Sequence, residues 1–352
     1  MTEPTSFARP TVFCSRCLGF EACRWNGDII REPFIDELRR HAVFITACPE
    51  GDMGLGVPRD PIRIVGSRDS DEVRLIQPAT GRDCTADMDG MIQGFLARME
   101  AGPKPALDDP VPEVIRWDDR DALPAVDGFI LKHRSPSCGP NTVRIYREAT
   151  NPAVLRRGAG LFAQALLKRY SDLPIEDEGR LHNFLIREHW LTRVFASARL
   201  REVAASGSMG RLVDFHSDHK FLFMAYSQTG LRELGRIVAA GSKKTFPTTV
   251  AAYQDRFHKA LVKPARFTSV INVFQHIQGY FSKRISPEER RYFENVVEEY
   301  RRGGLPMSVP VQILKNWAIR FEEKYILRQV FLQPYPQRLV SITDSGKGRG
   351  MK

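Results

Sequence analysis

The sequence of 352 residues predicts an α/β domain followed by an all-α domain. In residues 1–178, short β-branched or aromatic runs alternate with helical patterns, which is typical of helices packed on a largely parallel sheet. In residues 179–340, apolar residues recur at a helical spacing from one segment to the next, as they do in a helical bundle. We therefore place the domain boundary after residue 178, and we expect the small, basic residues 341–352 to form a disordered tail.

Five strands and three helices are expected in the first domain. Thr85 is the expected N-cap of the longest helix, because apolar residues follow it at helical spacing. The proline- and acid-rich residues 101–124 lack such periodicity and are expected to form a long surface excursion. The expected strands are residues 11–15, 42–48, 62–65, 73–76 and 128–132, and the expected helices are residues 35–41, 85–99 and 160–169.

Seven helices with short connections are expected in the second domain. Gly, Pro or Ser-Pro breaks fall between most of its periodic segments, and such breaks are typical of helix ends. The expected helices are residues 181–200, 209–226, 230–240, 248–261, 268–283, 287–302 and 309–331.

Charge also divides the chain. Residues 1–180 contain 24 Lys and Arg against 28 Asp and Glu, whereas residues 181–352 contain 28 against 14, a net charge of +14. A basic half attracts polyanions, so contact with RNA or a nucleotide is one interpretation, and a solvated helical surface is the other. The sequence has no signal peptide and no run of the roughly 18 to 20 apolar residues that span a membrane, so we expect a cytoplasmic protein without a membrane partner.

All six cysteines lie in the first 138 residues. In a reducing compartment, such thiols are candidate metal ligands or nucleophiles. Three of them, Cys17, Cys48 and Cys138, follow the ends of expected strands, in turns marked by glycine or proline. The carboxyl ends of parallel strands meet at one edge of a sheet, so we expect these three thiols to converge.

Three converging thiolates are compatible with several kinds of site. A structural zinc site needs four ligands, commonly in closely spaced pairs, and only Cys14 and Cys17 form such a pair. The zinc signature of nucleobase deaminases does not occur. A [4Fe-4S] cluster on three cysteines leaves one iron open, and this soft Lewis acid suits a sulfur ligand. Thiol redox chemistry and purely structural thiols stay open from spacing alone, as does a ligand role for Cys14 or Cys23.

Polar side chains accompany the second and third cysteine loops. Glu50 follows Cys48 by two residues, and its carboxylate is suited to activate water or, equally simply, to begin a helix. Ser135 and Ser137 precede Cys138, and their hydroxyls suit substrate binding or the capping of the next segment. We favour Glu50 and Ser135 as catalytic residues.

At these loops the sequence resembles the thiouracil desulfidase family. The family pattern runs S-x-C-L-x-G-x-x-x-R-(F/Y)-D-G, then C-P-E-x-x-x-G-L-x-x-P-R-x-P, then L-K-x-x-S-P-S-C-G. The second motif is complete in residues 48–61 and the third in residues 131–139. In the first motif, Phe20, Trp25 and Asn26 replace the glycine, the Phe or Tyr and the aspartate of the pattern.

The resemblance implies a Rossmann-like fold and a [4Fe-4S] cluster held by Cys17, Cys48 and Cys138, with Glu50 and Ser135 as essential residues. It also implies an enzyme that hydrolyses the C–S bond of a thiouracil-type base or nucleotide without net electron transfer, giving a uracil-type product and sulfide. The alternative is a non-catalytic protein, with a cluster or zinc, that binds nucleic acid and senses redox state. The second half resembles a helical domain of uncertain function that is often fused to this one.

Overall fold

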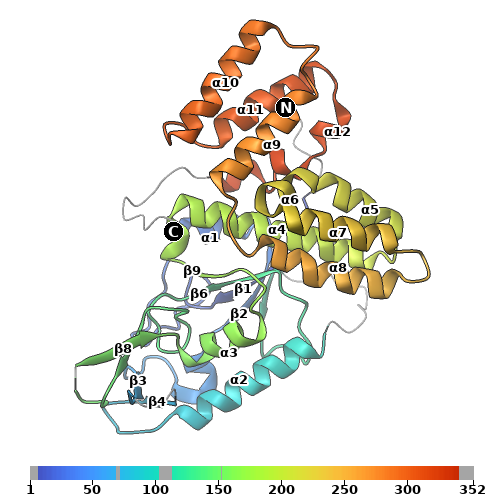
Figure 1. The fold of residues 1–352 in the computed structure, drawn as a ribbon. Helices are drawn as coiled ribbons and strands as arrows, with labels where there is room; N and C mark the ends of the chain where they lie inside the picture. Colours follow the sequence, from blue (N-terminus) through green and yellow to red (C-terminus); the bar gives the residue numbers. More distant parts are fainter. Residues whose placement is uncertain (1–6, 69–71, 103–112, 152, 341–352) are drawn as a thin grey trace. The chain divides into compact units, whose positions relative to one another are not determined.

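The structure is a computed structural model that describes residues 7–68, 72–102, 113–151 and 153–340 (Figure 1). The tail at residues 341–352, which we expected to be disordered, lies outside the described residues. The chain consists of an α/β part with a parallel sheet and a helical part after it, as predicted. In the part of the chain that the structure describes, no helix is both long enough and apolar enough to cross a bilayer.

The chain divides into two compact units. The first unit comprises Met1–Ala198 with Pro336–Lys352, and the second comprises Arg199–Tyr335. The division falls within one long helix, α4 (Phe184–Ala205), rather than after residue 178. Where an independently folding domain ends therefore stays a prediction.

Among the described residues of the first unit, five parallel strands form the main sheet, in the order β5-β2-β1-β6-β9. The central strand β1 is buried along its whole length. Its middle residues, Val12, Phe13 and Cys14, are all apolar, as is typical of strands that are covered on both faces. Since β2, β1 and β6 are neighbours and parallel, the loops that follow them begin at the same edge of the sheet. The strands are β1 (Thr11–Ser15), β2 (Val43–Ala47), β5 (Val114–Arg116), β6 (Gly128–Leu131) and β9 (Ile175–Asp177).

A second sheet has four strands in the described part of the chain, in the order β4-β3-β7-β8. Its central pair, β3 and β7, is parallel, and the two outer pairs are antiparallel. The expected strands at residues 62–65 and 73–76 are present, but they pair in this sheet and not in the main one. The strands are β3 (Arg63–Gly66), β4 (Val73–Ile76), β7 (Val143–Tyr146) and β8 (Val154–Gly158).

Four strands were not predicted: β5, β7, β8 and β9. Three of them, β5, β8 and β9, lie at sheet edges, where pairing with a neighbour defines a short strand more than its own residue preference does. β5 also lies inside residues 101–124, which we expected to form a long surface excursion, and at Val114–Arg116 this segment instead pairs with β2 of the main sheet.

The three helices that the sequence predicts in the α/β part are present at the expected places. They are α1 (Pro33–Leu38), α2 (Thr85–Glu100) and α3 (Leu161–Arg169). The prediction that Thr85 caps α2 is wrong by one residue, since the cap position is Cys84. Thr85 begins the helix, its Oγ accepts a hydrogen bond from the Leu75 amide at 2.8 Å, and its own amide donates to Asp83 at 3.0 Å.

A group of phenylalanines forms the core between β1, α2 and α3. The ring of Phe13 lies 5.2 Å from that of Phe95 and 5.5 Å from that of Phe162, and the latter two rings lie 5.1 Å apart. All three side chains are fully buried, and burial of this kind is the main favourable term in folding. The core therefore packs α2 and α3 against the central strand of the main sheet.

The second unit consists of helices, as the sequence predicts, but two of the expected helices differ in extent. The expected helix at residues 209–226 is interrupted at His219, and that at residues 309–331 ends at Arg320, after which Glu322 adopts a left-handed φ of 52°. The helices are α5 (Met209–Asp218), α6 (Lys220–Tyr226), α7 (Gln228–Ala240), α8 (Phe246–Leu261), α9 (Phe267–Gly279), α10 (Pro287–Arg301), α11 (Ser308–Arg320) and α12 (Lys324–Leu327).

Candidate functional site

The loops that follow β1, β2 and β6 line one cavity of about 460 Å³. The structure brings the three predicted ligands, Cys17, Cys48 and Cys138, to this cavity, together with Glu50 and Ser135. The convergence follows from the strand order, because β1 lies between β2 and β6 in a parallel sheet. The roles of these five residues stay predictions.

A fourth cysteine, Cys23, also lines the cavity. It belongs to the first loop and was considered from the sequence only as an alternative ligand. By contrast, Cys14 and Cys84 are fully buried and do not line this cavity. All six cysteines are free thiols.

Hydrogen bonds distinguish Cys48 from the other cysteines of the cavity. A hydrogen bond from the Cys23 thiol lowers the pKa of Cys48 to about 7, helped by the Gly51 amide and by the charge of Arg59, while burial opposes the shift. The pKa of Cys23 is raised correspondingly, first by its hydrogen bond to Cys48 and then by burial. Cys48 is therefore the thiol that is most readily ionised among these four, and thiolates are the form that binds metals.

Burial has the opposite effect on the two remaining cysteines. It raises the pKa of Cys17 to about 12, with a further contribution from the charge of Cys48, and Lys132 opposes the shift. Burial also raises the pKa of Cys138, although a hydrogen bond from Ser15 works against it. Several thiolates in one buried cavity repel one another, and a bound cationic group relieves that repulsion.

Glu50 is held from two sides. Its Oε2 accepts hydrogen bonds from Nε and Nη2 of Arg59, at 3.1 and 2.9 Å. Its Oε1 accepts hydrogen bonds from the hydroxyls of Ser137, at 2.6 Å, and of Ser135, at 3.2 Å. The Glu50 carboxylate of the second loop is thus hydrogen-bonded directly to both serines of the third loop.

The two serines play different structural parts. Ser135 Oγ accepts hydrogen bonds from the amides of Ser137 and Cys138, at 3.3 and 3.1 Å, so it also holds the loop in shape. Ser137 is fully buried, whereas Ser135 is partly exposed to the cavity. The preference for Ser135 over Ser137 as the substrate-facing hydroxyl is compatible with this exposure and stays a prediction.

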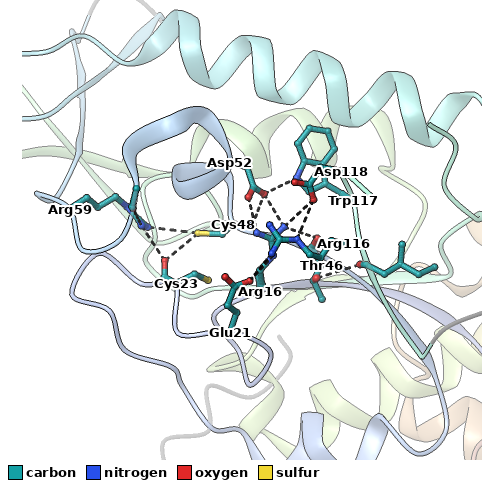
Figure 2. A network of polar contacts seen from close by, with 12 residues as sticks. Arg16, Glu21, Cys23, Thr46, Cys48, Asp52, Arg59, Arg116, Trp117 and Asp118 are labelled. Carbon is teal, nitrogen blue, oxygen red and sulfur yellow. Dashed lines mark hydrogen bonds and ion pairs between the residues drawn. The ribbon is translucent and has the colours of Figure 1, made fainter. Parts of the chain in front are cut away.

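A buried network fixes the start of the second loop (Figure 2). Asp52 accepts hydrogen bonds from the Cys48 amide at 2.9 Å, from the Trp117 indole at 2.7 Å and from Arg16 at 2.8 Å. The side chains of Arg16 and Asp52 are 4% and 6% exposed, so their pair is strong and oriented. It stabilises the turn η1 (Gly51–Leu55), where the motif glycine, Gly54, has a φ of 94° that a side chain would strain.

Sequence reasoning missed the roles of Arg59 and Asp52. Both lie inside the second motif, residues 48–61, so the motif contained them without indicating what they contact. Two partners of Asp52, Arg16 and Trp117, directly follow β1 and β5 and lie outside the motif. A motif in one segment carries no signal for such contacts. Within the described residues, no three His, Cys, Asp or Glu side chains are arranged around a single metal ion.

Comparisons with known proteins match each part of the chain to a family. A sequence model of the 2-thiouracil desulfurase family matches residues 12–107 and 118–178. A model of DUF1722, a protein family of unknown function, matches residues 220–336.

Individual proteins are similar to parts of the chain. The uncharacterized protein YbgA of Escherichia coli (strain K12) is 30% identical over 158 residues, which are 44% of this chain and 93% of YbgA. The uncharacterized protein YbbK of Bacillus subtilis (strain 168) is 28% identical over 132 residues, which are 36% of this chain and 72% of YbbK. Among solved structures, the [4Fe-4S]-dependent thiouracil desulfidase TudS is 25% identical, covering 49% of this chain and 93% of its own, with a TM-score of 0.34.

The matched regions agree with the division into an α/β part and a helical part. All three cysteine loops lie within the region matched by the first family. The second match begins at Lys220, the first residue of α6, and extends through α12. The chain therefore belongs to the 2-thiouracil desulfurase family through residues 12–178 and carries a DUF1722 region after them.

Proposed function

We propose that this protein is a [4Fe-4S]-dependent desulfidase that removes sulfur from thiouracil-type bases or nucleotides. One observation carries the proposal: Cys17, Cys48 and Cys138 line one cavity together with Glu50 and Ser135. Membership of the family supports a thiouracil-type substrate. Contact of the basic helical half with RNA or a nucleotide stays a prediction based on charge.

The residues of the cavity fit an iron–sulfur cluster. Cys17, Cys48 and Cys138 are free and almost fully buried, and soft thiolates are the ligands that such clusters prefer. In a cubane each cysteine binds a different iron, so the three sulfurs need not meet at one point. A cluster held in this way would supply an iron without a protein ligand, which is a soft Lewis acid for a thiocarbonyl sulfur.

The residues around the cavity supply the acid–base chemistry of hydrolysis. In this proposal Glu50 takes a proton from water, and the water oxygen then forms a bond to the ring carbon of the substrate. Ser135 and Ser137 donate hydrogen bonds to Oε1 of Glu50, and in this proposal the partly exposed Ser135 binds a substrate oxygen or nitrogen. The C–S bond breaks with both electrons going to sulfur, so water and a thiocarbonyl become a carbonyl and hydrogen sulfide, with no oxidant or reductant.

Sulfide release from purified protein tests the proposal. Protein prepared without oxygen and supplied with iron and sulfide should be brown and should release sulfide from 2-thiouracil, 4-thiouracil or one of their nucleotides. Cys48→Ala should lose the colour and the activity, whereas Cys84→Ala, at a buried cysteine outside the cavity, should keep both. Glu50→Gln should keep the colour while its turnover falls by about 10²- to 10⁴-fold, the usual effect of losing a general base.

Two results would contradict the proposal. One is a protein that stays colourless after anaerobic iron and sulfide treatment. The other is a brown protein that releases no sulfide from any thiobase or thionucleotide of the panel, which would favour the non-catalytic alternative.

A further inference from the structure

Arg59 connects three functional parts of the cavity through one guanidinium group. Its Nε and Nη2 donate to Oε2 of Glu50, and Nη2 also lies 3.8 Å from Sγ of Cys48. Its Nη1 donates to the carbonyl oxygen of Cys23 at 3.1 Å and to that of Gly56 at 2.9 Å. Figure 2 shows the guanidinium facing both Cys23 and Cys48, so a single side chain contacts the first loop, a predicted ligand and the predicted base.

The contacts divide the two oxygens of Glu50 between different partners. Arg59 occupies Oε2, while the hydroxyls of Ser135 and Ser137 contact Oε1. Without the first contact, the carboxylate is held at one oxygen alone and is free to tilt about it. Arg59 therefore fixes the orientation of the carboxylate relative to the third loop.

We infer that Arg59 is a positioning residue of the desulfidase: it fixes Glu50 relative to Cys48 and to the first loop. The inference rests on the proposed function, because it assigns Arg59 a part in that reaction. The Arg59 side chain is 3% exposed, so its hydrogen bonds are made away from water, where they are strong and directional. Reaction rates are sensitive to such positioning, and a displacement of about 1 Å is able to lower a rate by about 10²-fold.

The contacts require arginine rather than any cation. The guanidinium is planar and presents donors in fixed directions, so it reaches a carboxylate, a sulfur and two carbonyls at once. A lysine is a point charge on a flexible chain and reaches one or two of them. Loss of the N–H near Cys48 should also change a bound cluster, because hydrogen bonds to cysteine sulfur influence its reduction potential.

Steady-state kinetics and redox titration of Arg59→Gln and Arg59→Lys test the inference. For Arg59→Gln we expect wild-type iron content, a KM within about threefold of wild type and a kcat lower by about 10²-fold. We also expect its cluster to have a more negative midpoint potential, because a positive charge near sulfur favours the reduced cluster. Arg59→Lys should recover part of the potential shift but little of kcat, since it restores the charge without the fixed geometry.

Arg63→Gln is the matched control. Arg63 belongs to the same unit, donates to the carbonyl oxygen of Ala149 at 2.8 Å and packs on Tyr146, away from the cavity. It should keep wild-type kcat and potential. The inference is overturned if Arg59→Gln has the wild-type kcat and an unchanged midpoint potential. If Arg59→Gln does not fold, the same result for Arg59→Lys overturns it. It is equally overturned if only iron content falls, in proportion to activity. A wild-type protein that holds a cluster but releases no sulfide defeats the proposed function instead.

Discussion

Cys48 and Cys17 lie in the same cavity with the same exposure, yet their chemistry differs. Both are 8% exposed, so access does not separate them. The pKa of Cys48 is lowered to about 7 by the hydrogen bond from Cys23, and that of Cys17 is raised to about 12 by burial. At neutral pH, Cys48 is therefore in part a thiolate, whereas Cys17 is a thiol.

Alkylation of the cluster-free protein should reveal this difference. At neutral pH, iodoacetamide should modify Cys48 at least about tenfold faster than Cys17, because the thiolate is the nucleophile. As the pH falls through about 7, Cys48 becomes protonated and its rate should fall. Peptide mass spectrometry measures each site. Cys23→Ala removes the donated hydrogen bond and should move the rate decrease of Cys48 to higher pH; equal rates at Cys48 and Cys17 in the wild type would contradict the prediction.

Residues of the site were predictable where they follow a strand that the sequence pattern itself indicates. Cys17, Cys48 and Cys138 each follow a buried apolar strand, so their convergence could be deduced from the geometry of a parallel sheet. The role of Arg59 was not predictable in this way, because it depends on hydrogen bonds from Arg59 to Glu50 and Cys23 that form only in the folded structure.

Helices and strands differ in how far the sequence determines them. Helix α10 begins where the sequence predicts, because Ser286, Pro287 and Glu289 form a complete start signal. Strand β9, Ile175–Asp177, has two acidic residues in three and exists because β6 pairs with it. Patterns within one segment therefore predicted the helices well and the edge strands poorly.

The start of α10 allows a test at the level of one helix. Ser286 Oγ accepts a hydrogen bond from the Glu289 amide at 3.2 Å, and the Glu289 side chain accepts one from the Ser286 amide at 2.8 Å. Ser286→Ala should lower the free energy of unfolding by about 1 kcal/mol, since it leaves a helix-terminal amide without its partner. Urea denaturation measures the change. Ser308→Ala, in a helix whose cap residue makes no side-chain hydrogen bond, should have little effect, and an equal loss in both variants would refute the capping argument.

For the whole molecule, the open question is where the α/β part ends. The sequence places its end at residue 178, but the first compact unit continues to Ala198, within α4. Trp190 of this helix is 1% exposed, and its indole N–H points to the carbonyl oxygens of Phe129 and Pro174, at 3.3 and 3.2 Å. Val194 lies so close to Gly128 of β6 that a Cβ atom added at Gly128 would have to displace the Val194 side chain. These contacts make the first part of α4 a component of the sheet's own packing.

If α4 stabilises the main sheet, Trp190→Ala should loosen strands that lie far from it in sequence. Removing a buried tryptophan costs roughly 3 to 5 kcal/mol, so amides of β6 and β9 should exchange with solvent faster in the full-length protein. Hydrogen exchange followed by mass spectrometry resolves these segments. Val203→Ala, at a buried residue of the same helix beyond Ala198, should leave β6 and β9 unchanged. Unaltered exchange of both strands in Trp190→Ala would instead place the end of the α/β domain at residue 178, and α4 would then belong to the helical part alone.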